Sequence, residues 1–221
     1  HKFSTDERRA INWRIVYMKN TPFVGIAGNI GVGKTTFTEV LAKKYNWDEY
    51  YESVIDNPYL SDFYGDMKRW SFNLQIYFLQ HRFAGQLEIS NKNKGVIQDR
   101  TIYEDVQIFA KNLYELGHMS KRDWETYQNL FHNMVQFLKS PNVIVYLKAS
   151  TDTLISRIEN RNRDFEKNID VEYLHQLNSC YNNWAKNEKE LNIITIDTDN
   201  FNIFKDKDKL TDICTLIEES I

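Results

Sequence analysis

The sequence predicts an α/β fold in which a five-stranded parallel sheet is flanked by helices. From Pro22 onward, short apolar segments alternate with long segments of helical periodicity. The apolar segments are continuous rather than alternating in polarity, which is typical of strands buried on both faces of a parallel sheet. Strands that alternate with helices are joined by right-handed crossovers, so we expect the helices to cover both faces.

Composition excludes several classes of protein. The 221 residues are 42% hydrophobic and 27% charged, with 8 Gly and 3 Pro, unlike disordered or collagen-like chains. The formal net charge is -3, from 28 Lys and Arg against 31 Asp and Glu, and it predicts no nucleic-acid partner. Cys180 and Cys214 match no metal or redox spacing, and no apolar segment reaches the roughly 18 residues that span a membrane. We expect a cytoplasmic protein that binds no membrane.

We expect residues 21–221 to form one domain, because neither a repeat nor a low-complexity linker interrupts their pattern. Residues 1–20 carry mixed charges, a modest apolar stripe and no motif. We interpret them as an N-terminal extension or an expression remnant, in preference to an amphipathic anchor.

The first predicted strand, Phe23–Ala27, leads into a glycine-rich loop and then a predicted helix, Lys34–Asn46. The loop has the pattern G-x-x-x-x-G-K-T. Its glycines let the backbone bend around an anion, and its N–H groups and the helix N-terminus point at phosphate oxygens. Lys34 would contact the β- and γ-phosphates, and the Thr35 hydroxyl would ligate Mg²⁺. The predicted ATP-binding loop is Gly28, Asn29, Ile30, Gly31, Val32, Gly33, Lys34, Thr35 and Thr36.

A chance glycine-rich turn is the alternative to a phosphate site. The strand before the loop and the helix after it favour nucleotide binding, because the phosphate-binding motif requires that context. The loop alone does not distinguish a kinase from a GTPase or a motor ATPase. A GTPase is disfavoured, because the sequence lacks the guanine-binding signature N-K-x-D. The nearest match, at residues 91–94, has Lys94 in place of the aspartate.

Two polar features follow on the acceptor side. A short β-like segment ends at Tyr51 and is followed by Glu52, a carboxylate placed where a general base could reach a hydroxyl. In the predicted helix Met67–Asn91, Gln75 and Arg82 are seven residues apart and share one face, where the Gln amide suits a planar base. The alternatives are a solvated surface Glu and an amphipathic helix with two polar residues facing water.

The predicted strand Gly95–Gln98 is followed by Asp99, Arg100 and Thr101. An acidic residue that closes an apolar strand suits a metal-associated carboxylate, and the adjacent arginine can neutralise charge on a reacting oxygen. Asp99 or Thr101 could instead cap the next predicted helix, Thr101–Leu116, and both roles are compatible.

The remaining elements continue the alternation of helices and strands. They are the predicted helices Lys121–Lys139, Thr151–Arg163, Val171–Glu190 and Asp208–Ser220 and the predicted strands Asn142–Leu147 and Asn192–Ile196. Arg157, Arg161 and Arg163 end one helix and could complement its dipole. We favour a lid that places their guanidinium groups on the transferring phosphoryl.

Taken in order, these motifs resemble the deoxyribonucleoside kinase family, which contains deoxycytidine, deoxyguanosine and deoxyadenosine kinases. The resemblance covers most of the chain from Pro22 and is strongest to bacterial-type deoxyadenosine kinases. It rests on the combination of Gly28–Thr35, Glu52 with Asn57-Pro58-Tyr59-Leu60, Arg69-Trp70-Ser71-Phe72 leading to Gln75, Asp99-Arg100-Thr101, and the arginine segment ending at Glu166. It implies a P-loop kinase fold with an arginine-rich lid.

The resemblance also implies catalytic roles. Glu52 would deprotonate the deoxyribose 5′-hydroxyl, with Arg100 beside it and Lys34 on the donor phosphates. Asp99 and Thr35 would support Mg²⁺. Several relatives have Glu and Ser where this sequence has Asp99 and Thr101, changes that preserve the chemistry.

For the nucleoside, the resemblance implies that Tyr64 and Glu166 hold the 3′-hydroxyl and that Gln75, Arg82 and Asp105 bind the base. The aromatic walls of the pocket would be Trp70 and Phe109. Thymidine-accepting members lack the charged pair, so we expect a base with an exocyclic amine, adenine before guanine or cytosine.

For the donor, the resemblance implies that Arg157, Arg161 and Arg163 clamp the phosphates. The donor base would lie against Asp199, Asn200 and Phe201. Members of the family are commonly dimers, and the predicted helix Lys121–Lys139 is our candidate for the contact between two copies.

Two other functions are compatible with a phosphate loop. A nucleoside monophosphate kinase such as thymidylate kinase shares the loop and the lid, but its anionic acceptor requires extra arginines, whereas Glu52, Tyr64 and Gln75 suit a neutral acceptor. A non-catalytic nucleotide-binding module would need no base and would be indifferent to the loss of Glu52.

Overall fold

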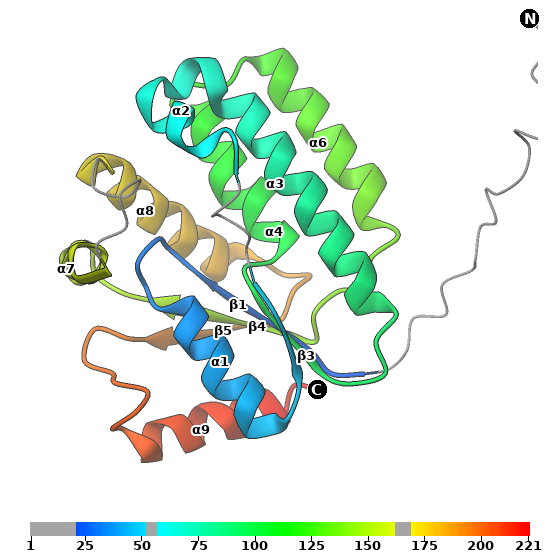
Figure 1. Cartoon of the computed structure of the whole chain (residues 1–221), viewed down its shortest axis with the longest axis vertical. Coiled ribbons are helices and arrows are strands. Elements are labelled where there is room, and N and C mark those ends of the chain that lie inside the picture. The colour runs from blue at the N-terminus through cyan, green and yellow to red at the C-terminus, as the bar shows by residue number, and fades with distance from the viewer. Residues whose placement is uncertain (1–20, 52–56, 162–168) are drawn as a thin grey trace, which may run out of the picture.

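The computed structural model describes residues 21–51, 57–161 and 169–221. Three predicted site residues, Glu52, Arg163 and Glu166, lie outside these ranges. Figure 1 shows a parallel sheet covered by helices on both faces. No helix in the described ranges combines the length and hydrophobicity that crossing a membrane requires.

The sheet confirms the predicted architecture. Its strands are β1 (Phe23–Gly28), β2 (Asp48–Tyr50), β3 (Val96–Asp99), β4 (Val143–Lys148) and β5 (Ile193–Asp197). They pair in the order β2-β3-β1-β4-β5, and every neighbouring pair is parallel. The central strand β1 is buried along its whole length, as its continuous apolar sequence predicts.

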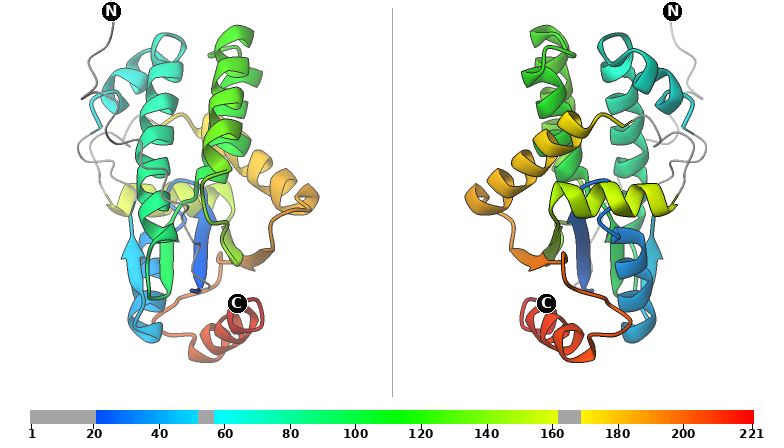
Figure 2. Two further views of the ribbon diagram at one scale, coloured as in Figure 1. Left: turned by 90° about the vertical axis from the view of Figure 1, so that its right-hand side faces the viewer. Right: turned by 90° about the vertical axis from the view of Figure 1, so that its left-hand side faces the viewer.

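Helices pack on both faces of this sheet. They are α1 (Lys34–Tyr45), α2 (Leu60–Gly65), α3 (Met67–Ser90), α4 (Ile102–Glu104), the π-helical segment η1 (Asp105–Ala110), α5 (Lys111–Glu115), α6 (Lys121–Val135), α7 (Thr151–Arg161), α8 (Val171–Asn187) and α9 (Lys207–Glu218). Val24 and Ile26 of β1 pack with α1 and α9 on one face, whereas Ala27 packs with α3, η1 and α8 on the other. α3 and α6 lie side by side (Figure 2).

The largest differences between the structure and the predicted elements are in three places. The predicted helix Thr101–Leu116 is divided into α4, η1 and α5, and such π-helical turns are frequent at functional sites. α6 ends at Val135 rather than Lys139, because the Lys139 N–H donates to Ser90 Oγ and its carbonyl accepts from Gln86, both on α3. The short helix α2 was not predicted.

Gly25 and Gly85 offer a matched test of packing around the central strand. A Cβ at Gly25 would overlap Cγ2 of Thr101, whereas a Cβ at Gly85 in α3 would meet nothing within 4 Å. We therefore expect Gly25→Ala to lower the free energy of unfolding by about 1–3 kcal/mol. Gly85→Ala should raise it by about 0.5–1 kcal/mol, because alanine favours the helix. Urea denaturation of both variants measures the difference, and equal stabilities would contradict the packing.

Candidate active site

The candidate active site lies at the edge of the sheet where β1 and β3 end. Ile26 of β1 is opposite Asp99 of β3, so the glycine loop and the turn at Arg100 leave the sheet next to each other. Gly31 in the loop has φ 84°, and a Cβ there would lie 2.6 Å from Cγ1 of Ile158 in α7. Glycine suits this left-handed, closely packed position, and the loop is bent as a phosphate-binding loop must be.

Lys34 lies inside this loop. Its side chain is buried, and Nζ donates to the carbonyl oxygens of Gly28 and Asn29, at 2.9 and 3.1 Å. Lys34 is also the first residue of α1, so its backbone N–H is one of those that begin this helix. A lysine held between a helix N-terminus and a bent loop is suited to a polyphosphate.

Thr35 and Asp99 form a pair suited to a divalent cation. Thr35 Oγ1 donates to Asp99 Oδ2 at 2.7 Å. Asp99 is buried, and its other carboxylate oxygen has no hydrogen-bond partner among the described residues. Mg²⁺ prefers oxygen ligands and is commonly held by one or two protein groups together with substrate phosphates. The Thr35 hydroxyl and the unpaired Asp99 oxygen therefore fit the expected ion.

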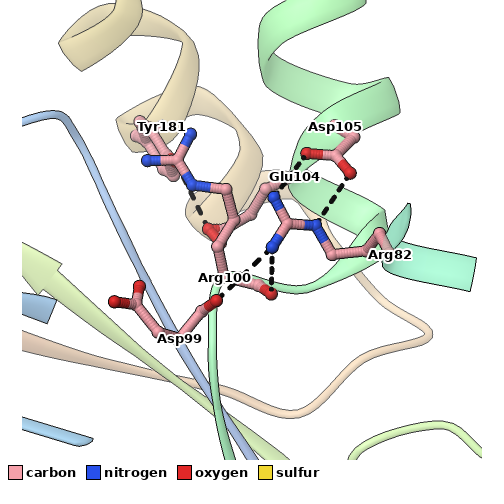
Figure 3. Close-up of polar contacts among 6 residues, drawn as sticks. All are labelled: Arg82, Asp99, Arg100, Glu104, Asp105 and Tyr181. Atoms are coloured by element: carbon pink, nitrogen blue, oxygen red, sulfur yellow. Dashed lines mark hydrogen bonds and ion pairs between the residues drawn. The ribbon is translucent and has the colours of Figure 1, made fainter. Parts of the chain in front are cut away.

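Arg82 and Asp105 form a buried ion pair at the centre of the site (Figure 3). Arg82 Nε donates to Asp105 Oδ2 at 2.9 Å, and Nη2 to Oδ1 at 3.3 Å. Arg82 Nη1 also donates to the carbonyl oxygens of Arg100 and Asp99, at 3.0 and 3.4 Å. The structure thus brings together the two side chains predicted to bind the base. It adds a contact that the sequence did not indicate, because Arg82 also holds the backbone that follows β3.

Arg100 occupies a strained turn directly after β3. Its φ is 66°, a left-handed conformation that is uncommon outside glycine, and its N–H donates to the Ile26 carbonyl at 2.9 Å. This turn directs the guanidinium over the ring of Phe109 in η1, with Cζ 4.2 Å from the ring centroid. Strained residues of this kind concentrate at functional sites.

Glu104 is a buried acid that the sequence analysis did not select. Its side chain is fully buried, and its Oε2 accepts a hydrogen bond from Tyr181 at 3.3 Å. Burial raises the pKa of this carboxyl from 4.5 to about 7, although the positive charges of Arg100, Lys34 and Arg82 oppose the rise. The only signal in the sequence for the burial of Glu104 is its position among the apolar residues Ile102, Tyr103 and Val106.

The side chains predicted to surround the nucleoside lie on α2, α3 and η1. Gln75 is 2% exposed, and its Oε1 has no hydrogen-bond partner among the described residues. A buried amide oxygen without a donor costs about 1–3 kcal/mol, so this atom is suited to accept from a ligand. Trp70 and Tyr64 are half-buried and pack against one apolar cluster, which includes Phe109.

Arg157 contacts backbone carbonyls, and its contact with the donor phosphates stays a prediction. Nη1 donates to the Val32 carbonyl in the glycine loop at 2.9 Å, and Nη2 to the Thr198 carbonyl at 2.6 Å. The guanidinium therefore joins the loop to the chain after β5, because two backbone carbonyls of separate segments converge on it. Arg161 is exposed at the end of α7, and its contact with phosphate stays a prediction.

The predicted donor-base segment is only partly open. Phe201 is 9% exposed and packs edge-on against Phe37 of α1, so its ring belongs to the core rather than to an open face. Asp199 accepts from the Ser150 N–H at 2.8 Å, and this hydrogen bond is the main cause that lowers the pKa of the Asp199 carboxyl. Asn200 is exposed, and its contact with a donor base stays a prediction.

The buried lysine in the loop after β1 and the Thr35–Asp99 pair beside it are features of a P-loop phosphotransferase site. The sequence model of the deoxynucleoside kinase family matches residues 24–221, and the chain belongs to that family. The enzyme is an ATP-dependent deoxynucleoside kinase, as the resemblance of its motifs implied.

Similar proteins cover nearly the whole chain. The deoxyadenosine/deoxycytidine kinase of Bacillus subtilis is 36% identical over 207 residues, 93% of this chain and 95% of that protein. A deoxyguanosine kinase of the same organism is 39% identical over 213 residues, 92% of this chain and all of that protein. The structure of a deoxyadenosine kinase from M. mycoides superposes with a TM-score of 0.78 at 31% identity, and the match covers 87% of this chain and 98% of that one.

The raised pKa of Glu104 predicts a specific pH dependence of stability. The folded protein holds this proton up to about pH 7, whereas the unfolded chain releases it near pH 4.5. Ionisation of the buried carboxyl therefore costs stability as the pH rises between those values, by about 3 kcal/mol in total.

Glu104→Gln removes the ionisation and keeps an acceptor for Tyr181. The free energy of unfolding of the wild type, minus that of this variant, should fall as the pH rises from 4.5 to about 7. Urea denaturation across that range measures the difference, and a difference independent of pH would contradict the burial of this charge.

Proposed function

We propose that the enzyme transfers the γ-phosphoryl group of ATP to the 5′-hydroxyl of a purine deoxyribonucleoside, with deoxyadenosine preferred over deoxyguanosine and deoxycytidine. The observation that carries this proposal is the position of the Arg82–Asp105 pair. Arg82 of this pair donates hydrogen bonds to the backbone carbonyls of Asp99 and Arg100. The Asp99 side chain in turn accepts a hydrogen bond from Thr35, which follows the phosphate loop. A nucleoside whose base reaches this pair would place its sugar towards the loop.

The charges around the loop suit phosphoryl transfer. Lys34 and Arg100 would stabilise negative charge on the phosphoryl oxygens, and their fixed positions avoid reorganisation during the reaction. Mg²⁺, when bound, would neutralise charge on the β- and γ-phosphates. Thr35 and Asp99 would hold it, and Glu52 would take the proton of the 5′-hydroxyl as general base.

The base preference is supported by hydrogen-bonding chemistry. Asp105 can only accept hydrogen bonds, which suits an exocyclic amine, while Arg82 fixes the orientation of its buried carboxylate. Gln75 adds a buried oxygen that, unlike those of Asp105, has no donor among the described residues. The related kinases of B. subtilis and M. mycoides are named for deoxyadenosine, deoxycytidine and deoxyguanosine, which supports an amine-bearing base and leaves adenine as our preference.

A homodimer and a cytoplasmic location stay predictions. Tyr127 and Phe131 of α6 are buried in this chain's own core, which leaves Leu130, 39% exposed, and Phe137, 53% exposed just beyond the helix, as its large apolar groups on the surface. A contact through α6 would use these side chains.

Glu52→Gln tests the proposed general base. Loss of a general base typically lowers the rate by about 10²–10⁴-fold, so we expect kcat to fall by at least about 10²-fold while ATP still binds. Steady-state turnover and ATP titration measure the two effects. The exposed residue Glu49 on β2 provides the control, because Glu49→Gln should leave both unchanged. Normal turnover by Glu52→Gln would contradict the mechanism and favour another base.

A competition assay tests the substrate. The four deoxynucleosides are supplied together with ATP and Mg²⁺, and we expect the highest kcat/KM for deoxyadenosine because its amine matches Asp105. Deoxyadenosine monophosphate is supplied separately and should not be phosphorylated. A preference for thymidine would overturn the role of Asp105, and phosphorylation of the monophosphate alone would favour a monophosphate kinase.

A further inference from the structure

Asn29 links the phosphate loop to α8. Its side chain is 1% exposed, and Nδ2 donates to the Leu174 carbonyl and to Asn178 Oδ1, each at 2.9 Å. Its Oδ1 accepts from the Ile30 N–H at 2.8 Å, so the same amide also fixes the backbone of the loop. The Asn29 amide therefore uses both of its N–H groups on α8 and its oxygen on the loop.

Asn178 completes this link from the opposite side. It is 9% exposed in the middle of α8, and its Nδ2 donates to the Ala149 carbonyl at 2.9 Å. Ala149 directly follows β4, the neighbour of β1 in the sheet. One side chain on α8 thus bridges the loop after β1 and the chain after β4.

The other side of the loop rests on α7. Leu154 and Ile158 leave no room for a side chain at Gly31, and Arg157 donates to the Val32 carbonyl. The α7 contacts restrain the tip of the loop by packing. The α8 contacts instead depend on two amides whose hydrogen bonds have a fixed direction.

These contacts bear on phosphate binding, because Asn29 lies between Gly28 and the N–H groups that follow. The Lys34 ammonium also binds the Asn29 carbonyl, so a shift of Asn29 would displace the lysine as well as the backbone donors. Positioning errors of about 1 Å can cost about 10²-fold in rate. Loss of the Asn178 contact would also leave one of the two N–H groups of the buried Asn29 Nδ2 unpaired.

We propose that Asn178 is a positioning residue for the donor phosphates and acts through Asn29. In this role Asn178 would act without touching phosphate or nucleoside itself. It holds the Asn29 amide, and Asn29 holds the loop in the bend that presents its N–H groups and Lys34. The proposal rests on ATP occupying this loop, as the proposed function has it.

Asn178→Ala is the test, with Asn183→Ala as the matched control, because Asn183 is exposed on the same helix. We expect Asn178→Ala to raise the KM for ATP about tenfold and to lower kcat, with the KM for the deoxynucleoside unchanged. Asn183→Ala should behave as the wild type. A lower melting temperature with an unchanged KM for ATP would show a merely structural role and would overturn the proposal.

Two further variants test the route through Asn29. Asn178→Asp keeps an oxygen acceptor for Asn29 but loses the donor to Ala149, so its KM for ATP should be nearer to the wild type than that of Asn178→Ala. In a double-mutant cycle, the effects of Asn29→Ala and Asn178→Ala on the KM for ATP should be less than additive. Both changes remove the Asn29–Asn178 hydrogen bond, although Asn29→Ala also removes the bonds to Leu174 and Ile30.

Independent effects of the two alanine changes, or an equal KM for Asn178→Asp and Asn178→Ala, would overturn the route. If Asn178→Ala does not fold, Asn178→Ser replaces it, because its shorter side chain cannot reach Asn29. A wild type that phosphorylates no deoxynucleoside would refute the proposed function, whereas an active wild type with an unaltered Asn178→Ala would refute this inference alone.

Discussion

The buried contact of Arg82 with Asp105 and with the backbone after β3 is the interaction on which the site depends. A buried ion pair must recover the cost of removing two charges from water, which it does only when further hydrogen bonds satisfy the remaining donors. Here Arg82 donates to both oxygens of Asp105 and to the carbonyls of Asp99 and Arg100. These bonds join α3, η1 and the strained turn at Arg100 into one unit, which fixes the directions of Asp99 and Arg100.

The same unit explains how a chain with a formal net charge of -3 can gather positive charge at one edge of its sheet. Lys34, Arg82 and Arg100 approach each other there, and the buried acids Asp99, Glu104 and Asp105 lie among them. The three cations oppose the rise in the pKa of Glu104 that burial causes. Charge is thus balanced locally, so the global composition carried no sign of the site.

The sequence predicted those parts of the structure that depend on local pattern. The buried strands, the glycine loop and the charged residues that end β3 are encoded in short contiguous segments, and a parallel sheet brings its strand ends to one edge. Contacts between distant segments could not be predicted in this way. The Arg157 side chain binds carbonyls of two separate loops, and Asn29 meets Asn178 across 149 positions. The π-helical turn that carries Asp105 and Phe109 likewise depends on packing against α3 and α8.

Arg82 also constrains how base preference can change within this fold. Because its guanidinium holds the backbone of Asp99 and Arg100, a substitution that alters its contact with a base would also move the groups nearest the phosphates. In the proposed complex, base recognition and phosphoryl transfer are therefore coupled at Arg82. Gln75 has a buried oxygen without a described partner, and Trp70 is half-buried at the margin of an apolar cluster. The described hydrogen bonds to the Asp99 and Arg100 carbonyls come instead from Arg82. In the proposed complex, changes at Gln75 and Trp70 would alter the shape and polarity of the base site while Asp99 stays bonded to Thr35. Related kinases that differ in their base can thus share one phosphate site.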